Sequence, residues 1–109
     1  MSMLHVVLMQ PRSHVDAARV EDLWQALRGL AAVIPGIEDV SCGPNTSPEG
    51  LEQGFTLGFV VRFTDAAARD GYVPHPAHVA VIPLVQAVAE RVLVFDLDQN
   101  GGSRAPAGR

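Results

Sequence analysis

The stretch 3-MLHVVLM-9 decides the fold, because its apolar side chains fall on both faces of a predicted strand. Side chains alternate from face to face along a strand. The two resulting sets are His5, Val7 and Met9 on one face, and Leu4, Val6 and Leu8 on the other. In so small a protein, a strand that is apolar on both sides indicates helices over one face and a second sheet against the other.

Outward from this strand, the chain shows two kinds of periodicity. Residues 16–33 carry one apolar stripe at helical spacing, and residues 55–63 alternate as a strand does. The same criteria predict helices at 16–33, 65–72 and 76–90, and strands at 37–42, 55–63 and 91–97. The resulting order is βαββαβ, which is typical of a ferredoxin-like α+β fold with an antiparallel sheet and helices on one face.

Two connecting features add detail to this pattern. The loop 43–54 is rich in turn residues, and Ser47-Pro48-Glu49 within it could start a single helical turn. Pro83 falls inside the last predicted helix, where it removes a hydrogen bond to the Val79 carbonyl and is expected to bend the axis.

Length and composition indicate one soluble domain. We expect residues 1–98 to form that domain and residues 99–109, which lack apolar periodicity, to be a disordered tail. The formal net charge is −4 and no lysine is present, which argues against nucleic-acid or membrane partners and excludes Schiff-base chemistry. With no signal peptide or membrane-spanning run, we expect a cytoplasmic protein.

The face that carries Leu4, Val6 and Leu8 has no covering element within one subunit. An exposed apolar sheet of that size would be an aggregation hazard. Two such sheets can close face to face into a two-subunit barrel, so we expect a homodimer.

The segment 72-YVPHPAH-78 holds the candidate chemistry and admits two interpretations. In the architectural one, His75 caps a helix, Pro76 occupies its first turn and Tyr72 closes the preceding loop. In the functional one, His78 is a neutral base near the positive end of the helix dipole, and Tyr72 is a hydrogen-bond donor to a carbonyl or enolate. His75 is assigned a structural role in both.

Other polar residues are open to similar alternatives. His5 is either a hydrogen-bonded core histidine or a pocket residue that faces His78. His75 and His78 are three residues apart and could bind one metal ion together, but no third ligand is evident. We therefore expect neither a metal nor a cofactor. Cys42 and His14 are expected to be a passive thiol and a solvated side chain.

A small apolar cavity is expected between the first helix and the sheet. Trp24 lies on the helical stripe, where it serves either core packing or a pocket wall. The candidate substrate-binding residues are Val7, Met9, Leu23, Trp24, Leu27 and Phe59.

Several stretches taken together resemble the stress-responsive A/B-barrel (Dabb) family over residues 3–98. They are 5-HVVLM-9, 34-IPGIEDVSCG-43, 47-SPEGLEQGFTLGFVVRF-63, 72-YVPHPAHVA-80 and 91-RVLVFD-96. The resemblance implies a dimeric α+β barrel. It extends to the plant polyketide cyclases of the olivetolic acid type, which perform a cofactor-free aldol condensation.

The resemblance to those cyclases also implies residue roles. Their catalytic Tyr and His fall on Tyr72 and His78, and their strand-one His falls on His5. Their aromatic pocket wall on the first helix falls on Leu23, Trp24 and Leu27. Two aromatics are therefore leucine here, and a third-strand His is Leu57, so a drier pocket of different shape is expected.

The leading hypothesis is a homodimer that binds a hydrophobic carbonyl or phenolic metabolite, with His78 as base, Tyr72 as donor and His5 as a positioning residue in an aldol-type cyclase or lyase. Two alternatives stay open: a non-catalytic stress-response or structural dimer, and a cofactor-free oxygenase of a phenol.

Overall fold

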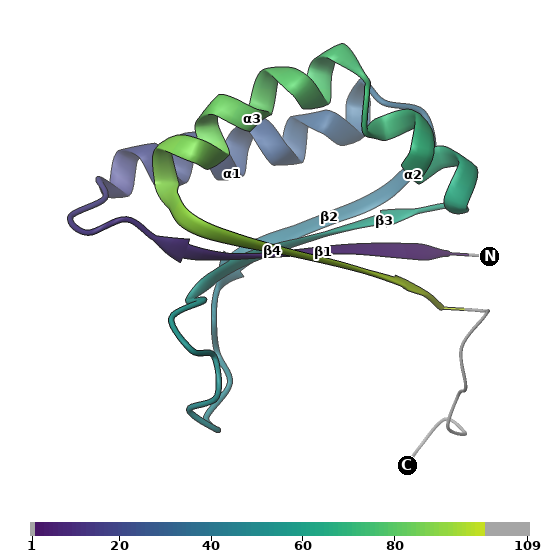
Figure 1. Cartoon of the computed structure of the whole chain (residues 1–109). Coiled ribbons are helices and arrows are strands. Elements are labelled where there is room, and N and C mark those ends of the chain that lie inside the picture. Colours follow the sequence, from purple (N-terminus) through teal and green to yellow (C-terminus); the bar gives the residue numbers. More distant parts are fainter. Residues whose placement is uncertain (1, 100–109) are drawn as a thin grey trace.

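The computed structural model describes residues 2–99, which form a four-stranded antiparallel sheet with helices on one side (Figure 1). The elements in chain order are β1 (Met3–Pro11), α1 (Ala17–Gly29), the 3-10 helix η1 (Leu30–Ala32), β2 (Ile37–Pro44), β3 (Leu57–Phe63), α2 (Ala66–Tyr72), α3 (Pro76–Val88) and β4 (Ala89–Asp98). The predicted tail 99–109 lies outside these residues except for Gln99. No helix in the described range is long and apolar enough to cross a membrane.

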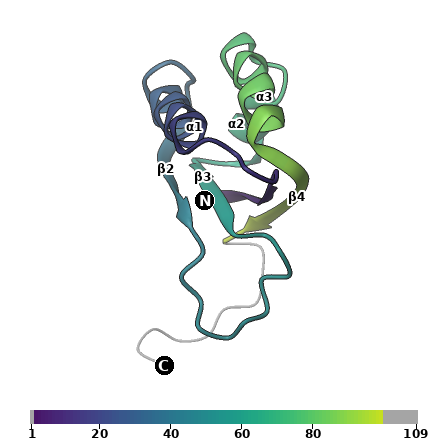
Figure 2. The same cartoon turned by 90° about the vertical axis from the view of Figure 1, so that its left-hand side faces the viewer.

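The strand order is β2-β3-β1-β4, so β1 lies in the interior of the sheet and pairs with β3 and β4. Viewed end-on, α1 and α3 lie side by side over one face, with β2 below α1 and β4 below α3 (Figure 2). This arrangement confirms the ferredoxin-like α+β prediction.

Each α-helix begins at a side-chain cap that its sequence supplies. The carboxylates of Asp16 and Asp65 accept hydrogen bonds from the Ala18 and Ala68 amides. At the start of α3, the Nδ1 atom of His75 accepts one from the Ala77 amide. Caps of this kind satisfy amides that have no partner within the helix.

Three local features differ from the pattern expected from sequence. The first predicted helix, 16–33, ends as an α-helix at Gly29 and continues only as the short turn η1. The single helical turn expected at Ser47-Pro48-Glu49 is a non-helical turn, in which the Ser47 hydroxyl accepts from the Glu49 amide. The strand expected from residue 55 begins at Leu57.

Residues 45–56, here called the arm, connect β2 to β3 and extend away from the sheet on the side opposite the helices (Figure 1). Arg91 of β4 holds the arm in place, since its Nη2 atom donates to the Gln53 carbonyl oxygen. Its guanidinium also lies 4.6 Å from the centre of the Phe55 ring.

The helix-covered face of the sheet forms the apolar core. Burial alternates along β1, so that His5, Val7 and Met9 are buried while Leu4, Val6 and Leu8 are only partly buried. The side chains of α1 complete the core with Leu23, Trp24 and Leu27.

The opposite face, here called the bare face, is apolar and open to solvent. Pairing of β1 with β4 places Leu97, Phe95 and Leu93 beside Leu4, Val6 and Leu8. Phe95 is 58% exposed. Two grooves of about 390 and 480 Å³ lie on this side, where the sheet meets the arm.

Candidate active site

One tyrosine and two histidines from three different elements lie in contact on the helix-covered side. Tyr72 ends α2, and its ring centre lies 5.6 Å from that of His5 on β1 and 4.1 Å from that of His78 in the first turn of α3. Phe63 packs edge-on against Tyr72 at 5.0 Å. The phenol ring therefore packs against both imidazoles.

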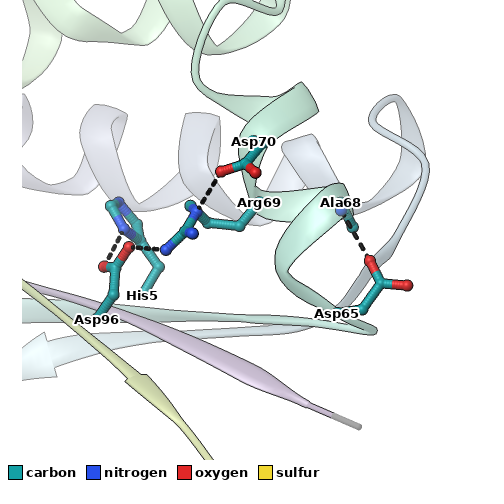
Figure 3. Close-up of polar contacts among 6 residues, drawn as sticks. All are labelled: His5, Asp65, Ala68, Arg69, Asp70 and Asp96. Atoms are coloured by element: carbon teal, nitrogen blue, oxygen red, sulfur yellow. Dashed lines mark hydrogen bonds and ion pairs between the residues drawn. The ribbon is translucent and has the colours of Figure 1, made fainter.

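His5 is held by a carboxylate across the sheet. The register of β1 and β4 places Asp96 directly opposite it, and His5 Nδ1 lies 2.8 Å from Asp96 Oδ1 (Figure 3). An ionised carboxylate only accepts hydrogen bonds, so Nδ1 carries the proton. In the neutral ring, Nε2 is then unprotonated and its lone pair can accept a hydrogen bond.

The other oxygen of Asp96 is bound as well. Arg69 Nη1 donates to Asp96 Oδ2 at 2.6 Å, while Arg69 Nε donates to Asp70 Oδ1 at 2.9 Å (Figure 3). The hydrogen bonds to Asp96 and Asp70 raise the pKa of the Arg69 guanidinium above its ordinary value. His5, Asp96 and Arg69 thus form one chain of charge-assisted contacts.

Tyr72 is suited to donate a hydrogen bond. Its side chain is 1% exposed, and burial raises its pKa to about 12. The phenol therefore keeps its proton at neutral pH.

His78 lies in the first turn of α3 and is less buried than His5. Its Nδ1 atom lies 2.9 Å from the Val73 carbonyl oxygen. Since a carbonyl only accepts, Nδ1 is again the protonated nitrogen, and Nε2 is left with a lone pair. Neither His5 nor His78 has a hydrogen-bond partner for Nε2 in the described part of the chain.

The structure gives His75 the architectural role. Its Nδ1 atom caps α3, which directs the ring to the helix end and not to Tyr72. The helix cap expected in 72-YVPHPAH-78 is therefore present, and the same segment also contributes Tyr72 and His78 to the cluster.

The six predicted wall residues lie in the core beneath the helices. Each is at most 7% exposed, and all belong to one packed cluster: Val7, Met9, Leu23, Trp24, Leu27 and Phe59. Phe59 also borders the smaller of the two bare-face grooves.

The remaining polar candidates lie apart from this cluster. His14 is exposed in the loop after β1. Cys42 on β2 is partly buried, which raises the pKa of its thiol, and the nearby Arg28 offsets part of that effect. Within residues 2–99, no group of three or more His, Cys, Asp or Glu side chains is arranged to hold a metal ion.

The family follows from the sequence comparison. A sequence profile of the stress responsive A/B barrel domain (Dabb) matches residues 3–99. The chain belongs to the Dabb family.

Three similar proteins show how far the similarity extends. Olivetolic acid cyclase from Cannabis sativa is 26% identical over 96 residues, which cover 88% of this chain and 95% of the cyclase. The stress-response A/B barrel domain-containing protein HS1 from Arabidopsis thaliana is 30% identical over 92 residues, or 84% of either protein. A dimeric ferredoxin-like protein of unknown function from Jannaschia sp. CCS1 superposes with a TM-score of 0.81 at 30% identity, covering 90% of this chain and 99% of that one.

Two residues of the candidate site, Asp96 and Arg69, were not predicted from the sequence. Asp96 did carry a signal, because it is the one acidic residue within the apolar stretch 91-RVLVFDL-97. Arg69 carried none, since an arginine on a short, solvent-facing helix is the ordinary case.

Proposed function

We propose that this Dabb protein is a homodimeric, cofactor-free acid–base catalyst that acts on a small hydrophobic carbonyl or phenolic metabolite. The observation that carries the proposal is the contact of one protonated phenol with two imidazoles whose Nε2 atoms are free. A donor and an acceptor at one site are the minimum needed to form and stabilise an enolate.

In the proposed reaction, the Tyr72 hydroxyl donates to the substrate carbonyl oxygen. His78 Nε2 removes a proton from the adjacent carbon, because His78 is the imidazole that is more open to an incoming molecule. His5, fixed by Asp96, packs against Tyr72 and orients it. The resulting enolate can then add to a second carbonyl, as in an aldol-type cyclisation.

The charges around the site favour a substrate that is neutral at its reacting end. The nearest guanidinium, that of Arg69, already contacts Asp96 and Asp70. A substrate carboxylate would therefore compete with two protein carboxylates for one cation, at a desolvation cost.

The similar proteins support the proposal, but they do not identify a substrate. Olivetolic acid cyclase bears a cyclase name, and its similarity covers nearly the whole folded chain. The dimeric protein from Jannaschia supports dimerisation. The proposed interface is the bare face, because no element within residues 2–99 covers its apolar side chains.

Proton exchange tests this proposal without knowledge of the natural substrate. Simple aryl methyl ketones and β-diketones in D₂O should lose their α-protons faster with the protein than without it. His78→Ala should slow this exchange by about 10²-fold or more, and Tyr72→Phe by a similar factor. His14→Ala, which changes an exposed histidine, is the matched control. No acceleration by the folded wild-type dimer with any probe would refute the catalytic proposal.

The tight burial of the six wall residues favours one other function, that of a non-catalytic dimer. In that case, apolar phenols should leave the fluorescence of Trp24 unchanged, and His78→Ala should alter stability alone. Quenching of Trp24 by a phenolic ligand would favour the binding pocket instead.

A further inference from the structure

Arg69 reaches the site from the same helix as Tyr72. The two residues are three apart in α2, so they lie on one helix face. Arg69 extends from α2 to Asp96 of β4 (Figure 3). The guanidinium is bound on two edges, by Asp96 and by Asp70, and its side chain is 24% exposed. Its geometry is thereby fixed more tightly than that of a typical surface arginine.

We propose that Arg69 is a positioning residue, which fixes Asp96 and thereby determines which nitrogen of His5 carries the proton. The inference rests on the proposed function, because it assigns Arg69 a part in orienting that same site. It acts through Asp96 and makes no contact with the reacting atoms.

The argument starts from the position of Asp96. It lies on the edge strand β4, and its side chain is 25% exposed, so a rotation toward solvent would be open to it. The Arg69 contact occupies Oδ2 and leaves Oδ1 as the atom that faces His5. Holding Oδ1 there keeps the proton of His5 on Nδ1 and the lone pair on Nε2.

The charges of the cluster support the same role. With neutral His5, the cluster of Asp70, Arg69 and Asp96 carries one excess negative charge. Arg69 is the cation that both carboxylates share, and its attraction holds Asp96 beside His5. Without Arg69, the same carboxylate would be free to turn to water.

A simpler explanation is that Arg69 only ties α2 to β4. The two roles can be distinguished by which nitrogen of His5 carries the proton. If Arg69 only links α2 to β4, its removal should not change that nitrogen. The ring ¹⁵N signals of His5 report it directly at about pH 8, where an ordinary imidazole is neutral. Wild-type protein should show Nδ1 protonated and Nε2 unprotonated.

The main variants are Arg69→Met, Arg69→Lys and the control Arg28→Met, which removes an arginine from an exposed ion pair. Arg69→Met should give a mixture of the two His5 tautomers, and Arg69→Lys should restore much of the wild-type signal. Arg28→Met should leave it unchanged. A folded Arg69→Met protein with the wild-type tautomer would overturn the proposal.

A second variant keeps the proposal testable if Arg69→Met does not fold. In Asp96→Asn, Arg69 would claim the amide oxygen, so the amide NH₂ would face His5 and move its proton to Nε2. The double variant Asp96→Asn/Arg69→Met should lose that inversion. If His5 in Asp96→Asn keeps its proton on Nδ1, Arg69 does not set the orientation and the proposal fails.

Kinetics complete the test where exchange activity is found. Arg69→Met should lower kcat for α-proton exchange on the order of 10²-fold with little change in KM, as expected for a misplaced catalytic group. Absence of exchange by wild-type protein would refute the proposed function alone. The tautomer shift would then still decide the role of Arg69.

Discussion

Tyr72 illustrates how much one buried side chain can report about the protein. It is the only tyrosine in the chain, so phenolate absorbance follows it alone. Burial raises its pKa to about 12, compared with about 10 for an exposed tyrosine. Absorbance titration of the folded protein should therefore show no phenolate at about pH 10.5, and full ionisation only at higher pH or on unfolding.

The same shift makes stability depend on pH in the alkaline range. Below about pH 10, the phenol is neutral in both states, and the pKa difference has no effect. Above it, the unfolded chain loses its proton first, so the free energy of unfolding should fall, by at most roughly 3 kcal/mol near pH 12. Urea denaturation of wild type and Tyr72→Phe across this range checks the sign. A Tyr72→Phe protein with the same alkaline loss would contradict the assignment.

His75 allows a separate test at the start of α3. Removing the Nδ1 acceptor in His75→Ala should cost about 1 kcal/mol of folding stability, because the Ala77 amide loses its cap. His75→Asn, which can supply another acceptor, should retain most of the stability. Thermal unfolding of the two variants provides the comparison, and equal losses in both would argue against the cap.

The sequence predicted part of the site at residue level and missed the rest for a physical reason. Tyr72 and His78 lie six residues apart, so a local motif could reveal both. His5 and Asp96 are separated by 91 positions, and their contact depends on the register of two strands. Strand register depends on the packing of the whole sheet, so it cannot be inferred from one segment of the chain.

At the level of elements, periodicity predicted every strand and helix of the fold but not their ends. Strand β4 begins at Ala89, two residues before its predicted start, because α3 passes into it without a loop. The first helix was predicted to extend to residue 33, but it changes to η1 at Leu30. Such ends depend on capping and tertiary contacts more than on apolar spacing.

Gly36, in the turn before β2, lies close to Ala68 of α2. Its φ is +89°, and a Cβ there would lie 2.5 Å from the Cβ of Ala68. Gly36→Ala should therefore destabilise the fold by more than about 1 kcal/mol, through both backbone strain and overlap.

The matched control for Gly36 is Gly29→Ala. Gly29 has helical backbone angles, and a Cβ there would meet no atom within 4 Å. This change should be neutral or slightly stabilising, since alanine favours a helix. Chemical denaturation of both variants measures the difference, and similar stabilities would contradict the proposed overlap.

For the whole molecule, the bare face is the feature with the largest expected effect. Val6 lies in the middle of it, beside Phe95 of β4. Val6→Asp should give insoluble or unfolded protein, because it would place an unpaired charge in the proposed subunit interface. Ala80→Asp, on the exposed side of α3, is the control and should remain soluble.

Sedimentation measures the assembly directly. Wild-type protein at micromolar concentration should sediment as a dimer. A folded monomer under those conditions would refute the bare-face interface. The sequence predicted this face from the alternation of side chains along β1 alone. The contribution of Leu93, Phe95 and Leu97 could be recognised only from the pairing of β1 with β4.

The first and last residues that the structure describes are hydrogen-bonded neighbours, since the Gln99 amide donates to the Ser2 carbonyl oxygen at 3.0 Å. A short linker could therefore join them, and new ends could be opened in the arm near Gly50, which is exposed. In such a circular permutant, β1 and β4 would become sequence neighbours and His5 and Asp96 would be linked locally. Contacts between residues close in sequence form earlier than distant ones, so the pairing of β1 with β4 should form earlier in refolding than it does in the natural order.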